Sequence, residues 1–146
     1  MPDYVEFKLK GADDIAAKFR SLSEGVRRQV ALPAAKDAMD IVRQDAEERA
    51  WRIDNPKTDP TIALNIVMQE RKKLDAEMGA VMVSVGVKGY GVRKGGPTFY
   101  WKFVELGTEH SRARPFLRPA LEQNRAQIFR EFLSSARYQL IRLGEF

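Results

Sequence analysis

The fold of this chain is organised around residues 100–123, which read Y-W-K-F-V-E-L-G-T-E-H-S-R-A-R-P-F-L-R-P-A-L-E-Q. An apolar run rich in aromatic and β-branched residues ends at Gly107, and a short polar segment follows it. Pro115 and Pro119 then introduce a helical pattern, because proline fits the first turn of a helix, where its missing N–H costs nothing. We predict a strand over Thr98–Leu106, followed by a charged loop and a long final helix. Because large apolar residues occupy alternate positions on both faces of this strand, it is buried on both sides or helps form a contact between subunits.

The loop in this stretch carries His110, Arg112 and Arg114, and two large apolar residues, Phe116 and Leu117, follow the charges directly. A charged loop that is anchored by its own apolar residues suits docking to a partner. The loop contains no catalytic pattern, because its histidine and the adjacent serine are not accompanied by the Gly-x-Ser-x-Gly turn of a hydrolase. We therefore give little weight to a hydrolase centred on His110.

The length of 146 residues favours one domain, residues 1–146, with a single core. A hydrophobic content of 44% is typical of a globular chain. The absence of cysteine excludes disulfides, thiol nucleophiles and thiolate metal sites. No apolar run reaches the roughly 20 residues that span a bilayer, and the first residues lack the layout of a signal peptide, so we expect no membrane partner and a cytoplasmic start.

The net charge of +5 invites a nucleic-acid interpretation, because clustered Lys and Arg release counterions from phosphates. Acidic residues are interleaved with basic ones over Asp37–Arg49 and Glu122–Arg137, however, which is typical of solvated helix faces. Basic residues remain in excess at Arg27-Arg28, Arg71–Lys73, Lys88–Lys94 and Arg112–Arg118. Non-specific proximity to DNA is therefore favoured over sequence-specific recognition.

The N-terminal part predicts one strand and two helices. Apolar and polar residues alternate over Tyr4–Lys10, as in a strand with one buried face. A short helix follows and ends near Leu22, with Asp13 or Asp14 as its expected cap.

The longest predicted helix covers Val26–Trp51, where apolar residues recur at helical spacing. Pro33 lies inside it and predicts either a kink or a break into two helices, because proline removes one backbone hydrogen bond. The many alanines on the inner face indicate close packing against another element, most simply a sheet.

The middle of the chain alternates between loops and short ordered segments. We predict a protruding loop over Ile53–Pro60, a helical turn over Thr61–Asn65, a strand from there towards Arg71, a polar connection over Lys72–Met78 and a strand over Ala80–Val87. The Gly-rich, basic segment Lys88–Pro97 has neither a following helix nor the G-K-[ST] of a nucleotide loop, so a hairpin loop is favoured over an anion site. The final helix is expected to reach Leu143, where Gly144 stops it.

No cofactor or metal site is predicted. With one histidine and no cysteine, only carboxylates remain as ligands, and those from Asp54 to Asp59 lack the spacing of an EF-hand. Trp51, Phe99 and Trp101 have the chemistry to stack on bases, but a position in the core is favoured for them.

Two motifs carry a family resemblance. The segment F-V-E-L-G-T at Phe103–Thr108 and the segment A-R-P-F-L-R-P-A at Ala113–Ala120 resemble the HK97 gp10-like family of tailed-phage morphogenesis proteins. That family is marked by an aromatic-rich strand ending in E-x-G-T, a short loop, and P-F-L-R-P-A at the start of the last helix. The chain departs from the family at Thr58–Ile66, where T-D-P-T-I-A-L-N-I replaces a T-G-x-L stretch.

The resemblance implies an α+β fold, in which a small, mainly antiparallel sheet is packed by a long N-terminal helix and a long C-terminal helix. It also implies a structural virion protein without enzymatic activity or cofactor, which completes the neck or tail end and joins tail to head as a ring-forming subunit. Its partners would be further copies of itself and other neck and tail proteins, after assembly in the cytoplasm of the bacterial host. Head-to-tail contacts between unlike surfaces close into such rings.

The residues expected to contact neighbouring subunits or partners are Glu105, Arg112, Arg114, Phe116 and Arg118. Phe116 and Leu117 have an equally weighted alternative, which is to anchor the final helix in its own core. Lys88, Arg93 and Lys94 are candidates for a loop that faces a partner or passing DNA without reading its sequence. The alternative function from another class is a small basic nucleic-acid-binding regulatory protein.

Overall fold

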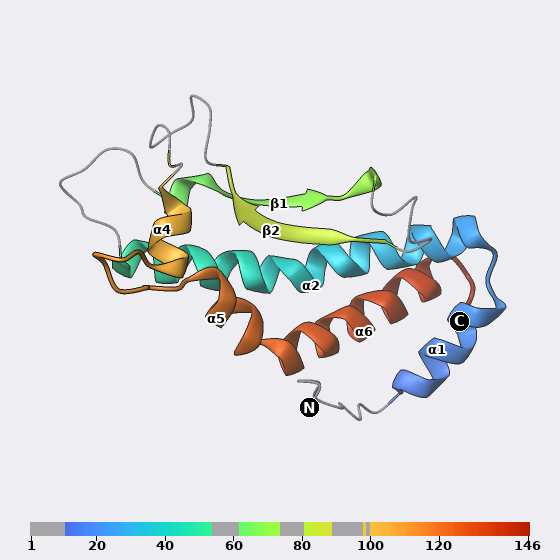
Figure 1. Cartoon of the computed structure of the whole chain (residues 1–146). Coiled ribbons are helices and arrows are strands. Elements are labelled where there is room, and N and C mark those ends of the chain that lie inside the picture. The colour runs from blue at the N-terminus through green and yellow to red at the C-terminus, as the bar shows by residue number, and fades with distance from the viewer. Residues whose placement is uncertain (1–10, 54–61, 74–80, 89–97, 99) are drawn as a thin grey trace.

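The computed structural model describes residues 11–53, 62–73, 81–88, 98 and 100–146 of the chain. These residues form an α+β fold, in which a two-stranded antiparallel sheet packs on one side of a long helix and the C-terminal helices pack on the other (Figure 1). This confirms the predicted fold class. The elements are α1 (Ala12–Ser21), α2 (Glu24–Ile53), the short 3-10 helix η1 (Ala63–Asn65), β1 (Ile66–Glu70), β2 (Val83–Val87), α4 (Trp101–Leu106), α5 (Leu117–Glu122) and α6 (Arg125–Arg142).

The buried stripe of α2 organises the core. Its buried residues recur every four positions: Val30, Ala34, Ala38, Val42, Ala46 and Ala50. Because a helix has 3.6 residues per turn, each step of four rotates the stripe by about 40°, and the whole stripe winds by about 200°. One end of α2 therefore packs with α1 and α6, while the other packs with η1, β1 and α5. The small alanines allow these elements to approach α2 closely, and the partners of the stripe include helices as well as the predicted sheet.

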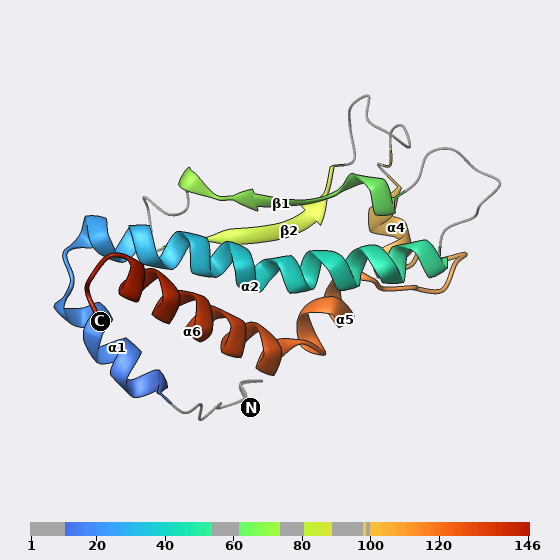
Figure 2. The same cartoon turned by 180° about the vertical axis from the view of Figure 1, so that it is seen from behind.

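Helix α2 continues through Pro33 without interruption, so the predicted alternative of two separate helices is wrong (Figure 2). Val30, nearly one turn before the proline, and Ala34, directly after it, are fully buried. Their packing holds the helical conformation through the position where one backbone hydrogen bond is lost.

The N-terminal helix α1 agrees with its predicted extent, but its predicted cap is wrong. Neither Asp13 nor Asp14 caps it, because both lie within its first turn. The preceding residue is Gly11, whose φ of 83° lies in the left-handed region, and its carbonyl accepts the N–H of Ile15. At the start of α2, in contrast, the Ser23 hydroxyl accepts the N–H of Val26, as in an ordinary N-cap.

The predicted helical turn and the two strands that follow it are confirmed as η1, β1 and β2. The strands pair antiparallel with Met68 opposite Val85. A buried polar contact closes the end of this hairpin, where the Asn65 amide donates to Thr98 Oγ1 over 3.3 Å and the Thr98 hydroxyl donates to the Lys88 carbonyl over 3.4 Å.

The predicted strand over Thr98–Leu106 is wrong, because its last six residues form the helix α4. Large apolar residues occupy both odd- and even-numbered positions of this segment. A helix accommodates this pattern better than a strand with one apolar and one polar face does. Trp101 and Val104, three positions apart, pack against the core, while Phe103 and Leu106 are exposed.

The single predicted C-terminal helix is also wrong, because it is divided into α5 and α6 at Gln123 and Asn124. The Asn124 amide donates to the Ala120 carbonyl over 2.7 Å and to Asp45 Oδ2 over 2.8 Å. This side chain caps the end of α5 and ties the break to α2. Helix α6 then ends before Gly144, as predicted.

Some predictions fall outside the described residues. They are the strand over Tyr4–Lys10, the loop over Ile53–Pro60 apart from its first residue, most of the connection over Lys72–Met78, and the Gly-rich segment Lys88–Pro97 apart from Lys88. Within the described ranges, no helix is both long enough and apolar enough to cross a membrane.

Candidate interaction surface

The carboxylate of Glu105 joins the end of α4 to the start of α5. Its Oε2 accepts the backbone N–H groups of Phe116 over 2.7 Å and Leu117 over 3.0 Å, and its Oε1 accepts the N–H of Arg118 over 2.9 Å. The first N–H groups of a helix have no partner within the helix, and a carboxylate suits them because the helix dipole is positive there. Glu105 thus caps α5 from a distant position in the sequence. Its carboxylate stabilises the fold of its own chain.

Gly107 lets the loop after α4 fold back onto the helix. Its φ of 78° lies in the left-handed region, and a Cβ at this position would lie 2.8 Å from the backbone nitrogen of Ala113. The close approach places the N–H of Arg114 on the carbonyl of Val104, at 2.8 Å. Glycine is required here for both the conformation and the space.

Thr108 closes the loop on itself. Its hydroxyl oxygen accepts the N–H groups of His110 over 3.2 Å and Ser111 over 2.9 Å, and its own N–H donates to the Ser111 carbonyl over 2.8 Å. Such side-chain contacts fix a turn that has no regular secondary structure. The loop over residues 107–115 is therefore held at both ends and in its middle.

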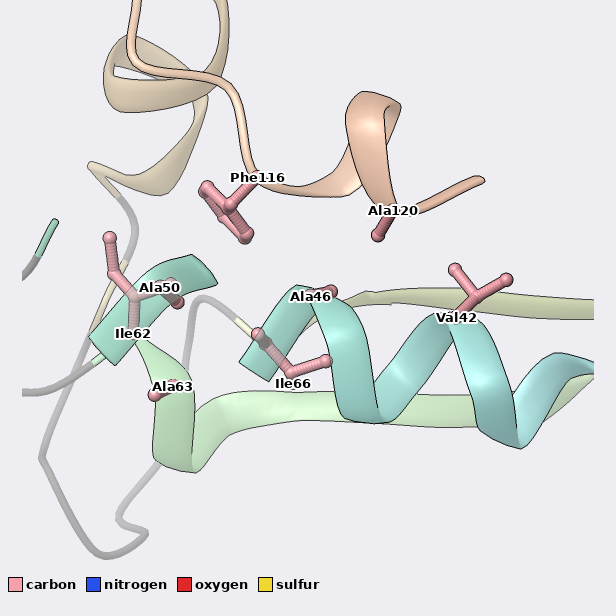
Figure 3. Close-up of a cluster of buried hydrophobic side chains, with 8 residues drawn as sticks. All are labelled: Val42, Ala46, Ala50, Ile62, Ala63, Ile66, Phe116 and Ala120. Atoms are coloured by element: carbon pink, nitrogen blue, oxygen red, sulfur yellow. The ribbon is translucent and has the colours of Figure 1, made fainter. Parts of the chain in front are cut away.

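Phe116 anchors the far end of this loop in the core. Its ring is fully buried against the stripe of α2, and Figure 3 shows Phe116 and Ala120 on one side of α2 and Ala63 on the other. Of the two predicted roles of Phe116, its position agrees with the anchor in the core. Its side chain forms no part of the exposed surface.

The exposed residues of this region combine apolar and basic groups. Phe103 and Leu106 lie on one face of α4 and are 55% and 78% exposed. Arg112 and Arg114 are exposed on the adjacent loop, and in the described part of the chain neither takes part in an ion pair. We call Phe103, Leu106, Arg112 and Arg114 the docking surface.

No protein-family model, curated protein or solved structure matches this chain. The resemblance of its motifs to a phage family therefore stays a prediction, and the function has to be argued from the residues themselves.

Arg118 lies beside the docking surface and already has a charge partner. Its guanidinium contacts Glu122 one turn along α5, at 3.0 Å, and both side chains are largely exposed. An exposed pair of this kind contributes little to stability, about 0.5 kcal/mol. Arg118 stays accessible to a partner.

Lys88 directly follows the last residue of β2, and this end of β2 lies at the same end of the molecule as α4 (Figure 1). Its side chain is exposed, while its backbone N–H donates to the Asn65 carbonyl over 2.8 Å. Arg93 and Lys94, predicted for the same basic loop, lie outside the described residues.

The aromatic and ionisable residues weighed for other chemistry are dispersed. Trp51 is half-exposed at the end of α2, so its predicted core position is wrong, whereas Trp101 packs partly against the core and Phe99 lies outside the described residues. His110 is exposed in the loop. Among the described residues, no group of three or more His, Asp or Glu side chains is placed to hold a metal ion.

Sequence reasoning placed Phe103 and Leu106 in a strand that was either buried on both faces or part of a contact between subunits, and it did not single them out as exposed residues of a helix. The signal that identifies them is the helical spacing of Trp101 and Val104, which leaves the residues between and beyond them on the opposite face. Asn124 was missed as well, since nothing in a continuous helical pattern marks a capping amide.

Proposed function

We propose that this chain is a structural virion protein of a long-tailed phage or prophage, which completes the neck or tail end and joins tail to head as a subunit of a homo-oligomeric ring. The observation that carries the proposal is the construction of the docking surface. Two exposed apolar residues and two arginines without ion pairs in the described part of the chain are presented by a loop that Glu105, Gly107, Thr108 and Phe116 hold in place.

This construction suits assembly because protein interfaces combine an apolar centre with a polar rim, in which arginine and aromatic residues are enriched. A loop that is already ordered loses little conformational freedom when it binds, so more of the contact energy appears as affinity. Phe103 and Leu106 would supply the apolar centre, and Arg112 and Arg114 the charged rim.

Under this proposal, some motif residues stabilise the fold and others contact the partner. Glu105 and Phe116 stabilise the fold, by capping α5 and by anchoring the loop in the core. Arg112 and Arg114, with Arg118 beside them, are the residues that touch the neighbouring subunit. A neighbour would need a different, acidic surface, and contacts between unlike surfaces close into rings.

Lys88 and the basic residues Arg93 and Lys94 that follow it in the sequence would face the lumen or a further neck or tail protein. Contact with passing DNA there would be electrostatic and independent of sequence, and it would weaken as salt increases.

The proposal is tested with a phage or prophage from which this gene is deleted. We expect filled heads and free tails that fail to join, and restoration of whole particles when the wild-type chain is supplied from a plasmid. A matched plasmid carrying His110→Ala should restore joining equally, because His110 is exposed and its hydrogen bond to Thr108 uses the backbone N–H, which alanine keeps. Normal joining in the deletion would overturn the proposal, and salt-dependent duplex binding without ring formation would favour the nucleic-acid-binding regulator instead.

A further inference from the structure

An apolar groove of about 350 Å³ lies between the start of β2 and the first half of α6, with α2 as its floor. All of its lining side chains are alanine, valine, isoleucine, methionine or phenylalanine, and they include Met39, Val81, Val83, Phe129 and Phe132. The docking surface contributes no residue to this groove.

The groove opens on the side of α6 that elsewhere faces the core. Phe129, Ala136 and Leu140 share one helical face, because they are seven and eleven residues apart. Ala136 and Leu140 are fully buried, whereas Phe129 is 50% exposed. The core-facing side of α6 is thus accessible at its N-terminal half, where an apolar ligand would bury further apolar surface.

One wall of the groove is the outer edge of a strand. The N–H of Arg71 donates to the Met82 carbonyl and the N–H of Lys88 donates to the Asn65 carbonyl, each over 2.8 Å. In an antiparallel ladder these bonds recur at every second residue, so Val83, Val85 and Val87 direct their N–H and C=O groups away from β1. Among the described residues, β2 pairs with β1 alone. Such an edge accepts an added strand.

The N-terminal segment of the same chain has the pattern that this site requires. Val5, Phe7 and Leu9 alternate with polar or amphipathic residues over Tyr4–Lys10. One face of such a strand would enter the groove, and the charged residues on the other face would stay in water.

The segment is also long enough to reach the groove. It joins α1, whose Ile15 packs in the same buried cluster as Phe132, and Phe132 lines the groove. The seven residues Tyr4–Lys10 span about 23 Å when extended, and Lys10 is bonded directly to Gly11 at the start of α1. An occupant attached to the same chain also has a high effective concentration at the site.

We propose that the groove between β2 and α6 is a binding site for an extended apolar strand, and that residues Tyr4–Lys10 of the same chain occupy it. Val5, Phe7 and Leu9 fill the groove, and their backbone pairs with the outer edge of β2. The added strand enlarges the sheet and covers an edge that would otherwise invite pairing between molecules.

Because the chain contains no cysteine, a direct test is possible on the isolated protein of residues 1–146. Val81→Cys places one thiol in the groove, and its rate of reaction with a water-soluble thiol reagent reports whether the groove is covered. Phe7→Asp should raise this rate by about tenfold or more. The substitution removes the aromatic side chain that is buried when the segment occupies the groove, so the segment would leave the groove more often. Tyr4→Asp, which makes the same change of charge on the opposite face of the segment, should leave the rate within about twofold of the parent.

Two controls separate the alternatives. Ala136→Cys reports on the core beside the groove, and it should stay unreactive in the Phe7→Asp background, because Ala136 is fully buried. If that thiol also reacts, the milder Val5→Ser replaces Phe7→Asp as the test variant. Equal rates for Val81→Cys in all backgrounds would overturn the proposal. Protection that increases with protein concentration would also overturn it, because the occupant would then be the N-terminal segment of a second copy.

Discussion

The carboxylate of Glu105 is the single group on which the loop depends most. It satisfies three backbone N–H groups at the start of α5, all within 3.0 Å. Glu105→Ala should lower the free energy of unfolding by about 2 kcal/mol, since a lost cap costs roughly 1 kcal/mol and hydrogen bonds to a charged group contribute more than neutral ones. Urea denaturation of the purified variant measures this change.

Glu109→Ala is the matched control for this prediction, because Glu109 is an exposed carboxylate in the same loop and forms no ion pair in the described structure. It should change the free energy of unfolding by less than about 0.5 kcal/mol. Equal effects of the two substitutions would show that the cap contributes nothing to stability.

The sequence did not identify Glu105 as a cap, and the reason is physical. Local caps are found within a few residues of a helix start, whereas Glu105 reaches α5 through a loop whose return depends on Gly107 and Ala113. Only the folded loop brings the carboxylate to those N–H groups. A charged residue in an apparent contact motif was therefore read as a partner contact.

At the scale of elements, the sequence correctly predicted the helices and strands whose apolar residues follow one consistent spacing. Helix α2 and strand β2 each have one consistent pattern, of four residues and of two residues, and both were predicted. The segment that became α4 has apolar residues on both parities, so its pattern is compatible with a strand or a helix. The packing of Trp101 and Val104 against the core decides the outcome, and that information is not local.

The break between α5 and α6 depends on a tertiary contact from α2. Asp45 accepts from Asn124 over 2.8 Å and from Arg49 over 3.1 Å, and Arg49 donates to Gln123 over 2.6 Å. Asn124→Ala removes both the contact to Asp45 and the cap on Ala120, so it should lower the free energy of unfolding by about 1–2 kcal/mol. Thermal unfolding followed by circular dichroism measures the loss.

Gln127→Ala serves as the control for the break, because Gln127 is an exposed amide one turn further along α6. Replacing it should leave the midpoint of thermal unfolding within about 2 °C of the parent. A matching small change for Asn124→Ala would mean that the break is fixed by the backbone alone.

For the whole molecule, the winding stripe of α2 places the docking surface and the apolar groove at different parts of the core. The core near α5 supports the docking surface, while the groove adjoins both core clusters, through Met39 and Ile128 on one and Phe132 on the other. The groove shares no lining residue with the docking surface, so the two proposals can fail independently.

Arg112→Glu combined with Arg114→Glu reverses the charge of the docking surface, and we expect it to weaken the ring assembly that we propose. Like charges at an interface are unfavourable, so association should weaken by about tenfold or more. The two side chains form no ion pair in the described structure, and the fold should therefore persist by circular dichroism. Lys36→Glu combined with Arg130→Glu makes the same change in net charge at exposed positions on α2 and α6, and should assemble normally. Sedimentation velocity compares the two pairs of substitutions, because a general effect of charge would act on both pairs alike. Normal assembly of the loop variant would remove Arg112 and Arg114 from the interface.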